Sequence, residues 1–279
     1  MTVAAPIYPV GLSVLTLLAV GMNVAFAAQT GWGKTYVSHS YIEENAEDYD
    51  LTVVLDYKDE YSGLVETGHL KRMTAPSGSE NITPEQWQGI VESVNGLQVV
   101  RAGLKDGQWQ ELLANLILAL EATDLSVFLV LDEAHRFAPQ RGSYPEEIST
   151  LATTYHGDGF GVVWMFQRFA KIDKTVLSCC TASMLGGFGT TNDIGQLDTI
   201  EYNADVHLKD KAGVSHLSED LCVDGEPLAL QRFTDNEGHT TGSEWIYSEG
   251  GERRRLDSRE FEMESEHYGS NRKRIQHPF

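Results

Sequence analysis

The sequence predicts an α/β fold with a mainly parallel central sheet, and two patterns carry that prediction. Short apolar runs alternate with segments of helical periodicity, which is the order of βαβ units. Most residues of these runs are apolar, at consecutive and not only at alternate positions, as expected for strands that helices cover on both faces. With 279 residues, of which 41% are hydrophobic, the chain can bury a sizeable core.

The expected strands are, in chain order, 22–27, 51–56, 97–101, 126–131 and 161–166. Helices are expected at 34–49, 83–94, 109–122 and 146–155. The helix at 83–94 has the clearest start, because Thr83 can cap it, Pro84 suits its first turn and Gln86 can complete a capping box. We expect one domain over 1–247 with a core at about 20–210, a small β-rich extension over 204–247 with strands at 204–208, 227–233 and 243–247, and a flexible, mixed-charge tail at 248–279.

The N-terminal segment is apolar and carries no charged residue up to position 33. A cleaved signal sequence is disfavoured, since no positive residue precedes the apolar run at 7–28, so secretion is not expected. A membrane span needs roughly 20 apolar residues, and prolines, glycines and polar residues interrupt this run. The pattern favours a buried segment ending in the strand at 22–27, with a membrane span as the alternative.

The charge is strongly acidic, with 41 Asp and Glu against 21 Lys and Arg and a net charge of -20. Such an excess destabilises a compact state by self-repulsion in ordinary buffer, and halophiles use it. The composition favours the cytosol of a salt-loving organism, with an acidic protein adapted to ordinary salt as the alternative, and disfavours a free-standing basic nucleic-acid-binding module. The cysteines lack disulfide or metal-ligand spacing and are expected to be small buried residues in a reducing compartment: Cys179, Cys180 and Cys222.

The residues between the first strand and the first helix fit the phosphate-binding pattern G-x-x-x-x-G-K-[ST], except that alanine replaces the first glycine. They are Ala28, Gln29, Thr30, Gly31, Trp32, Gly33, Lys34 and Thr35. A loop at this place can present backbone N–H groups and a helix N-terminus to phosphates. Lys34 is expected to reach the β- and γ-phosphates of ATP, and the Thr35 hydroxyl to bind Mg²⁺.

Polar residues follow two of the later strands. The strand at 126–131 ends in two carboxylates, of which Asp132 is expected to complete the Mg²⁺ site and Glu133 to polarise the attacking water as general base. Gln167 follows the strand at 161–166 and is expected to sense the γ-phosphate or orient water, with a surface glutamine as the alternative.

Together these motifs resemble the HerA–FtsK superfamily of DNA-pumping ATPases over roughly 20–210. The segments that carry the resemblance are the phosphate loop, 55–61, 131–139, 166–168 and 173–180. The resemblance implies a RecA-like P-loop NTPase fold, an ATP- and Mg²⁺-dependent ATPase, and a homo-oligomeric ring, expected to be a hexamer, that moves double-stranded DNA. Within the superfamily the chain looks most like ATPases of haloarchaeal viruses and plasmids, for which a viral capsid or membrane protein is a further expected partner.

The chain departs from the family pattern near the arginine that acts on a neighbouring subunit's nucleotide. Relatives usually have an arginine where this chain has residues 154–157, and Gln-Arg-Pro where it has residues 167–169. The trans-acting arginine is therefore unassigned, and the candidates, in order, are Arg141, Arg136 and Arg168.

Two functions of different kinds stay open. The first is ATP-driven DNA translocation in genome packaging or plasmid transfer, in the cytoplasm of a haloarchaeal host or on the virion. The alternative is a nucleotide-binding, membrane-associated virion or secretion component that does not pump DNA. Basic clusters at 253–255 and 272–274 could contact DNA phosphates or an anionic membrane, although a solvated tail is favoured because acidic residues interleave with them.

Overall fold

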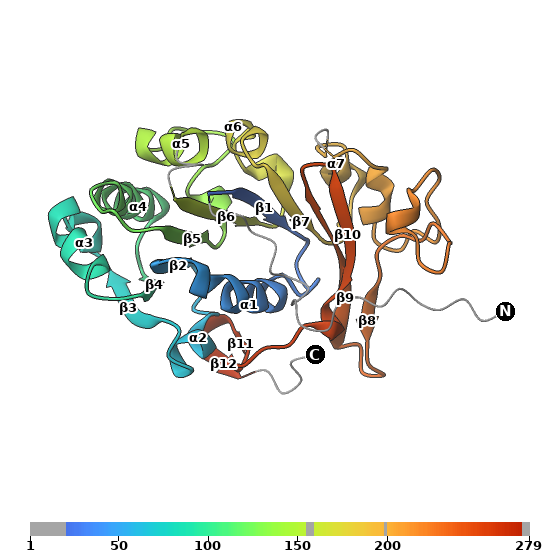
Figure 1. Ribbon diagram of the computed structural model, residues 1–279, viewed down its shortest axis with the longest axis horizontal. Coiled ribbons are helices and arrows are strands. Elements are labelled where there is room, and N and C mark those ends of the chain that lie inside the picture. Colours follow the sequence, from blue (N-terminus) through green and yellow to red (C-terminus); the bar gives the residue numbers. More distant parts are fainter. Residues whose placement is uncertain (1–20, 155–158, 198–199, 275–279) are drawn as a thin grey trace.

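A computed structural model describes residues 21–154, 159–197 and 200–274 (Figure 1). Its parallel strands are β1 (Asn23–Ala27), β2 (Leu51–Asp56), β3 (Lys71–Pro76), β4 (Gly96–Ala102), β5 (Val127–Leu131), β6 (Phe160–Phe166) and β7 (Ala182–Leu185). Three more strands are antiparallel to their neighbours: β8 (Arg232–Thr234), β9 (Thr240–Glu249) and β10 (Glu252–Asp257). Within the described ranges these ten strands form one sheet, in the order β10-β9-β7-β1-β6-β5-β2-β4-β3, with β8 paired to β9.

Helices cover both faces of this sheet (Figure 1). One face packs against α3 (Pro84–Val91), α4 (Asp106–Glu121), α5 (Glu146–Thr153), α6 (Lys174–Ser178) and α7 (Thr191–Ile194). The other face packs against α1 (Lys34–Asn45) and α2 (Ser62–Glu66). Alternate residues of β1 enter the two cores, Ala25 and Ala27 on the first face and Val24 and Phe26 on the second. The predicted α/β class with a mainly parallel, doubly covered sheet is therefore confirmed.

The predicted strands of the core all form, within one or two residues of their expected ends. The capping box is also present, since Thr83 accepts a hydrogen bond from the Gln86 N–H and the Gln86 side chain from the Thr83 N–H. The first helix ends at Asn45, and a 3₁₀ turn (Ala46–Asp48) completes the expected range.

Several short elements were not predicted: α2, β3, α6, β7 and α7. Strand β3 lies at the sheet edge, where only Ala75 is buried, so it lacks an apolar run. Strand β7 has only four residues and is defined by its pairing with β1 and β9. Such elements depend on their neighbours in the sheet and leave little periodic signal in the sequence.

The C-terminal third differs most from expectation. The expected strand at 204–208 is a 3₁₀ turn (Ala204–His207), and only the last residues of 227–233 enter β8. The segment expected as a tail instead contributes β10 to the main sheet. One of its basic residues is paired inside the fold. The buried Arg255 guanidinium forms an ion pair with Glu244 at 2.5 Å and donates to the backbone carbonyls of Leu221, Leu228 and Ala229.

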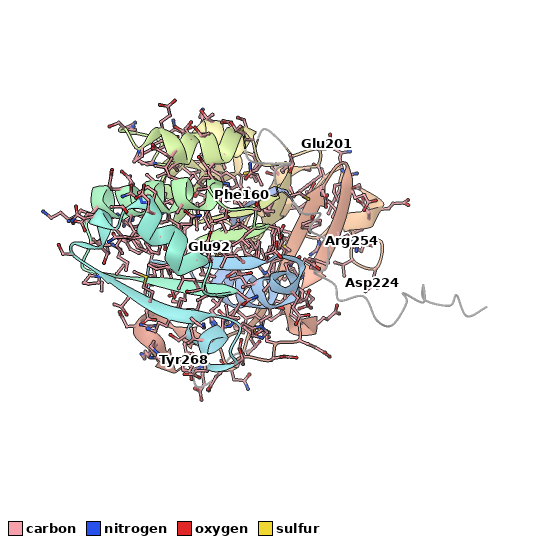
Figure 2. The ribbon with its side chains drawn as sticks, turned by 60° about the vertical axis from the view of Figure 1, so that its left-hand side comes forward. Glu92, Phe160, Glu201, Asp224, Arg254 and Tyr268 are labelled. Carbon is pink, nitrogen blue, oxygen red and sulfur yellow. The ribbon has the colours of Figure 1, made fainter. Side chains whose placement is uncertain are left out.

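Residues 261–273, which we call the strap, run from β10 across α1 and α2 to the small antiparallel pair β11 (Tyr268–Gly269) and β12 (Lys273–Arg274). Phe261 is buried in the core beneath α1. Tyr268, labelled in Figure 2, donates its hydroxyl to Glu66 of α2 at 2.7 Å. These contacts hold the strap on the face of the sheet that α1 and α2 cover.

Parts of the N-terminal and loop expectations lie outside the described residues, namely the apolar segment up to residue 20 and residues 155–158. No helix in the part of the chain that the structure describes is long and apolar enough to cross a membrane. The cysteines are free thiols with intermediate exposure, so they are less buried than expected.

Candidate active site

The phosphate loop joins the end of β1 to the start of α1, as predicted. Gly31 (φ 78°) and Gly33 (φ 86°) adopt left-handed backbone conformations that suit glycine. Ala28 is not among the described residues with positive φ, so its side chain causes no strain in place of the usual glycine. Gly33 stands at the N-cap of α1 without a capping side chain. The N–H groups of the first helical turn are thus left for an incoming acceptor.

Trp32 anchors the tip of this loop to the C-terminal part of the sheet. Its indole is 1% exposed and lies so close to Gly187 that a Cβ there would be 2.4 Å from the ring. Its N–H donates to the Glu244 carbonyl oxygen at 3.0 Å, and its own carbonyl accepts from the Ser243 hydroxyl at 2.6 Å. The loop therefore depends on β9, whose residues 243–247 were expected as a strand of the β-rich extension.

Lys34 and Asp132 form a buried pair at the centre of the site. The Lys34 Nζ lies 3.3 Å from Asp132 Oδ1, and their side chains are 8% and 1% exposed. Burial raises the pKa of Asp132, and the Lys34 ammonium acts against that shift. The second oxygen, Oδ2, is buried without a hydrogen-bond partner among the described residues. A fully desolvated, unsatisfied carboxylate oxygen is costly, so it calls for a further ligand.

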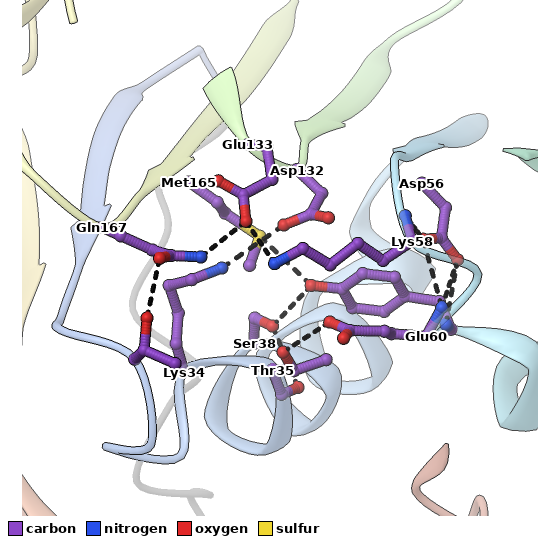
Figure 3. A network of polar contacts seen from close by, with 12 residues as sticks. Lys34, Thr35, Ser38, Asp56, Lys58, Glu60, Asp132, Glu133, Met165 and Gln167 are labelled. Carbon is purple, nitrogen blue, oxygen red and sulfur yellow. Dashed lines mark hydrogen bonds and ion pairs between the residues drawn. The ribbon is translucent and has the colours of Figure 1, made fainter. Parts of the chain in front are cut away.

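Thr35 points to the same region and donates its hydroxyl to Glu60 Oε2 at 2.9 Å (Figure 3). Glu60 was not assigned a role from the sequence. It lies within the segment 55–61 on which the family resemblance partly rests, and only that position in the sequence could have pointed to a role for Glu60 in the site.

Glu133 follows β5 in a left-handed conformation (φ 52°, ψ 46°), which turns its side chain back over the sheet edge. Its Oε1 accepts from the Gln167 side-chain N–H at 2.5 Å and pairs with the Lys58 ammonium (Figure 3). Burial by itself would raise the pKa of Glu133, but the ammonium groups of Lys34 and Lys58 outweigh it and lower that pKa. The carboxylate is therefore ionised at neutral pH.

Gln167 bridges the phosphate loop and Glu133. Its Oε1 accepts from the Thr30 hydroxyl at 2.8 Å while its N–H group donates to Glu133. It thus emerges into the site and is not a free surface residue. The structure brings together the side chains that the sequence singled out at three strand ends: Lys34, Asp132, Glu133 and Gln167.

The loop after β2 is organised by Asp56, which is fully buried. Its carboxylate accepts from the backbone N–H groups of Lys58, Glu60 and Tyr61 and from the Gln98 side chain. Burial, with the nearby Asp132 charge, raises the pKa of Asp56 to about 7. By fixing this turn, Asp56 places Lys58 beside Glu133 and Glu60 beside Thr35. Lys58 and Glu60 were not predicted as site residues from the sequence.

The three candidate arginines lie away from this cluster in the single chain. Arg136 pairs with Asp106 at 2.8 Å, and Arg168 lies 3.4 Å from Asp193. Arg141 is exposed and, with Arg136 and Lys171, lines a cavity of about 430 Å³. Within the described ranges, none of the three guanidinium groups forms a hydrogen bond or ion pair with the side chain of Glu133 or Lys34.

The residues present fit a magnesium nucleotide. The uncapped helix start and Lys34 suit phosphate oxygens, and the Thr35 hydroxyl with the unpartnered Asp132 Oδ2 suits a hard cation. No group of three or more His, Cys, Asp or Glu side chains in the described ranges could hold a metal on its own. A Mg²⁺ ion here would therefore complete its coordination with phosphate oxygens and water.

Solved structures with a similar fold are known. The genome packaging NTPase B204 from Sulfolobus turreted icosahedral virus 2, in complex with ATPγS, matches with TM-score 0.56 and 12% identity over 85% of this chain and 98% of its own. The chain has a P-loop NTPase fold. VirB4 of Thermoanaerobacter pseudethanolicus matches with TM-score 0.56 and 10% identity, over 84% of this chain and 88% of its own.

The P-loop NTPase fold of this chain is thus similar to structures with which it shares only 10–12% sequence identity. No protein-family model matches the sequence, and no curated protein matches it. The likeness concerns the fold, and the chemistry has to be argued from the side chains that this chain places at its own sheet edge.

Proposed function

We propose that this protein is an ATP-hydrolysing motor that translocates double-stranded DNA, in viral genome packaging or plasmid DNA transfer, as a homo-oligomeric ring that we expect to be a hexamer. The observation that carries the proposal is the convergence of Lys34, Asp132, Glu133 and Gln167 beside an uncapped phosphate loop. The packaging NTPase among the structural matches supports this direction.

Each side chain has a chemical task in this proposal. Lys34 and the first-turn N–H groups of α1 bind the β- and γ-phosphates, and Thr35 and Asp132 hold Mg²⁺. The metal, when bound, supplies positive charge against the phosphate oxygens. Glu133, ionised and at the edge of the site, takes the proton of the attacking water, and Gln167 orients that water. The burial of Lys34, Asp132 and Glu133 strengthens their electrostatic effects.

The neighbouring subunit completes the site in this proposal. Arg141, exposed beside the 430 Å³ cavity, is the first candidate for the arginine that reaches a neighbour's nucleotide, ahead of Arg136 and Arg168, which have acidic partners within the chain. An arginine supplied in trans stabilises transition-state charge. Ring assembly would then be required for turnover, and a capsid or membrane protein would dock the ring in the host cytoplasm or on the virion.

The decisive experiment is ATP turnover by the purified protein in multimolar KCl, with and without duplex DNA, alongside its mass in solution. The high-salt buffer follows from the net charge of -20 and the proposal that the protein is halophilic. DNA-stimulated turnover by an oligomer is expected, and Lys34→Ala should abolish it. Nucleotide binding without DNA stimulation in the assembled protein would instead favour the alternative, a component that does not pump DNA.

A further inference from the structure

The ion pair between Lys58 and Glu133 joins the ends of two adjacent strands, β2 and β5. Glu133 is 5% exposed, whereas Lys58 is 35% exposed and can move into solvent. Oε1 of Glu133 accepts from both Lys58 and Gln167 (Figure 3). Because Gln167 is itself bound to Thr30 of the phosphate loop, Oε1 is the carboxylate oxygen that faces that loop.

The other oxygen of Glu133 faces away from the loop. Oε2 lies 3.4 Å from Nδ1 of His135, on the side of the arginine-lined cavity. A carboxylate oxygen offers about two lone-pair sites, and both sites of Oε1 are used by Lys58 and Gln167. In this arrangement Glu133 has no acceptor free on the side where it would meet a water near the phosphates.

Lys58 is held in place from two directions. Asp56 accepts from the Lys58 N–H at 3.1 Å, and the Lys58 carbonyl accepts from the N–H of Asn271 in the strap at 2.8 Å. The next residue, Asp59, accepts in the same way from the Arg272 N–H at 3.0 Å. The backbone of residue 58 is therefore fixed, and only its side chain can release Glu133.

From these contacts we propose that Lys58 is a positioning residue that holds Glu133 in a resting arrangement, and that turnover requires this ion pair to open. The proposal rests on the function proposed above, with Glu133 as the base. In this role Lys58 restrains hydrolysis before DNA and a neighbouring subunit engage. Opening needs only a rotation of the partly exposed Lys58 side chain, with no movement of β2 or β5.

The test is steady-state ATP hydrolysis by Lys58→Met and Lys58→Arg in the full chain. Lys58→Met keeps the shape of the stem but removes the charge, so kcat without DNA should rise by about threefold to tenfold, with KM for ATP changed by less than about twofold. DNA stimulation should shrink by the same factor. Lys58→Arg keeps the ion pair and should behave as wild type, and Lys174→Met, an exposed lysine of α6, is the matched control.

An unchanged or lower kcat in Lys58→Met, or a change confined to KM, would overturn the proposal, since Lys58 would then be a structural or nucleotide-binding residue. Lys58→Gln provides a second uncharged variant, and cooperative unfolding of each variant shows that the fold is kept. A wild type without turnover would overturn the proposed function itself, whereas an active wild type matched by Lys58→Met would overturn only the role of Lys58.

Discussion

The indole N–H of Trp32 donates a 3.0 Å hydrogen bond to the carbonyl oxygen of Glu244, 212 residues away along the chain. It links the tip of the phosphate loop to β9, and the indole also fills the space left by Gly186 and Gly187. The conformation of the loop therefore depends on a strand at the other end of the sequence.

Replacing Trp32 should weaken both stability and nucleotide binding. Trp32→Ala is expected to cost about 3–5 kcal/mol of unfolding free energy, because a buried indole is lost. Trp32→Phe should cost less but leave the Glu244 carbonyl without its donor, at about 1 kcal/mol beyond the loss of volume. Denaturant unfolding and ATP titration measure the two effects.

Trp87→Phe is the matched control for Trp32→Phe. Trp87 is fully buried in α3, and its Nε1 has no hydrogen-bond partner among the described residues. It should lose volume but no hydrogen bond and should bind ATP as wild type does. If Trp32→Phe also binds ATP normally, the proposed anchoring of the loop by β9 is wrong.

Lys34 and Glu133 should separate binding from chemistry. Lys34→Ala removes the ammonium that faces the phosphates and leaves Asp132 as an unpaired buried charge, so ATP binding should be lost. Glu133→Gln keeps the shape of the side chain but removes the base, so kcat should fall by about 10²–10⁴-fold while ATP still binds. Fluorescent-nucleotide binding and phosphate release measure the two steps, and equal turnover by wild type and Glu133→Gln would exclude Glu133 as the base.

Gly63 should report on the docking of the strap. A Cβ at residue 63 would lie 1.9 Å from the backbone carbonyl oxygen of Glu266, so Gly63→Ala should push the strap from α2 and cost about 1–3 kcal/mol. Gly89→Ala is the control, since no atom lies within 4 Å of that Cβ, and it should stabilise α3 by up to about 1 kcal/mol. Unfolding measurements and proteolysis within the strap check this contrast, and similar shifts in both variants would argue against a tightly docked strap.

Two buried histidines, His39 of α1 and His267 of the strap, should make stability depend on pH. Burial lowers the pKa of His39 to about 3 and that of His267 to about 4. In the unfolded chain both histidines have a pKa of about 6.5, so the unfolded state binds more protons than the folded state below that pH. The stability of the folded state therefore falls as the pH drops toward 4. Each histidine should cost about 2 kcal/mol between about pH 7.5 and about pH 5.

His267→Gln should remove about half of this pH-dependent loss, measured by chemical denaturation at constant KCl. His216→Asn is the control, because His216 is exposed and asparagine tolerates its left-handed backbone (φ 58°). An unchanged pH dependence in His267→Gln would show that this histidine is accessible to protons in the folded chain.

The core elements could be predicted because each has a local cause. The strand before Asp132 is a continuous apolar run, and the phosphate loop needs its glycines at Gly31 and Gly33 for backbone reasons alone. The segment after residue 248 was misjudged for the opposite reason. Its alternating charges look solvated in the sequence, but Arg255 becomes 8% exposed by pairing with Glu244.

The sequence by itself determined the core strands and the longer helices between them, the phosphate loop and the placement of Asp132, Glu133 and Gln167 at strand ends, because these follow from contacts between near neighbours. The tertiary structure alone decided that Lys58 pairs with Glu133, that Thr30 binds Gln167 and that Trp32 rests on β9. Those pairs are separated by 75, 137 and 212 residues. Nothing in the local pattern specifies such partners, because only the assembly of the sheet brings these distant segments of the chain together.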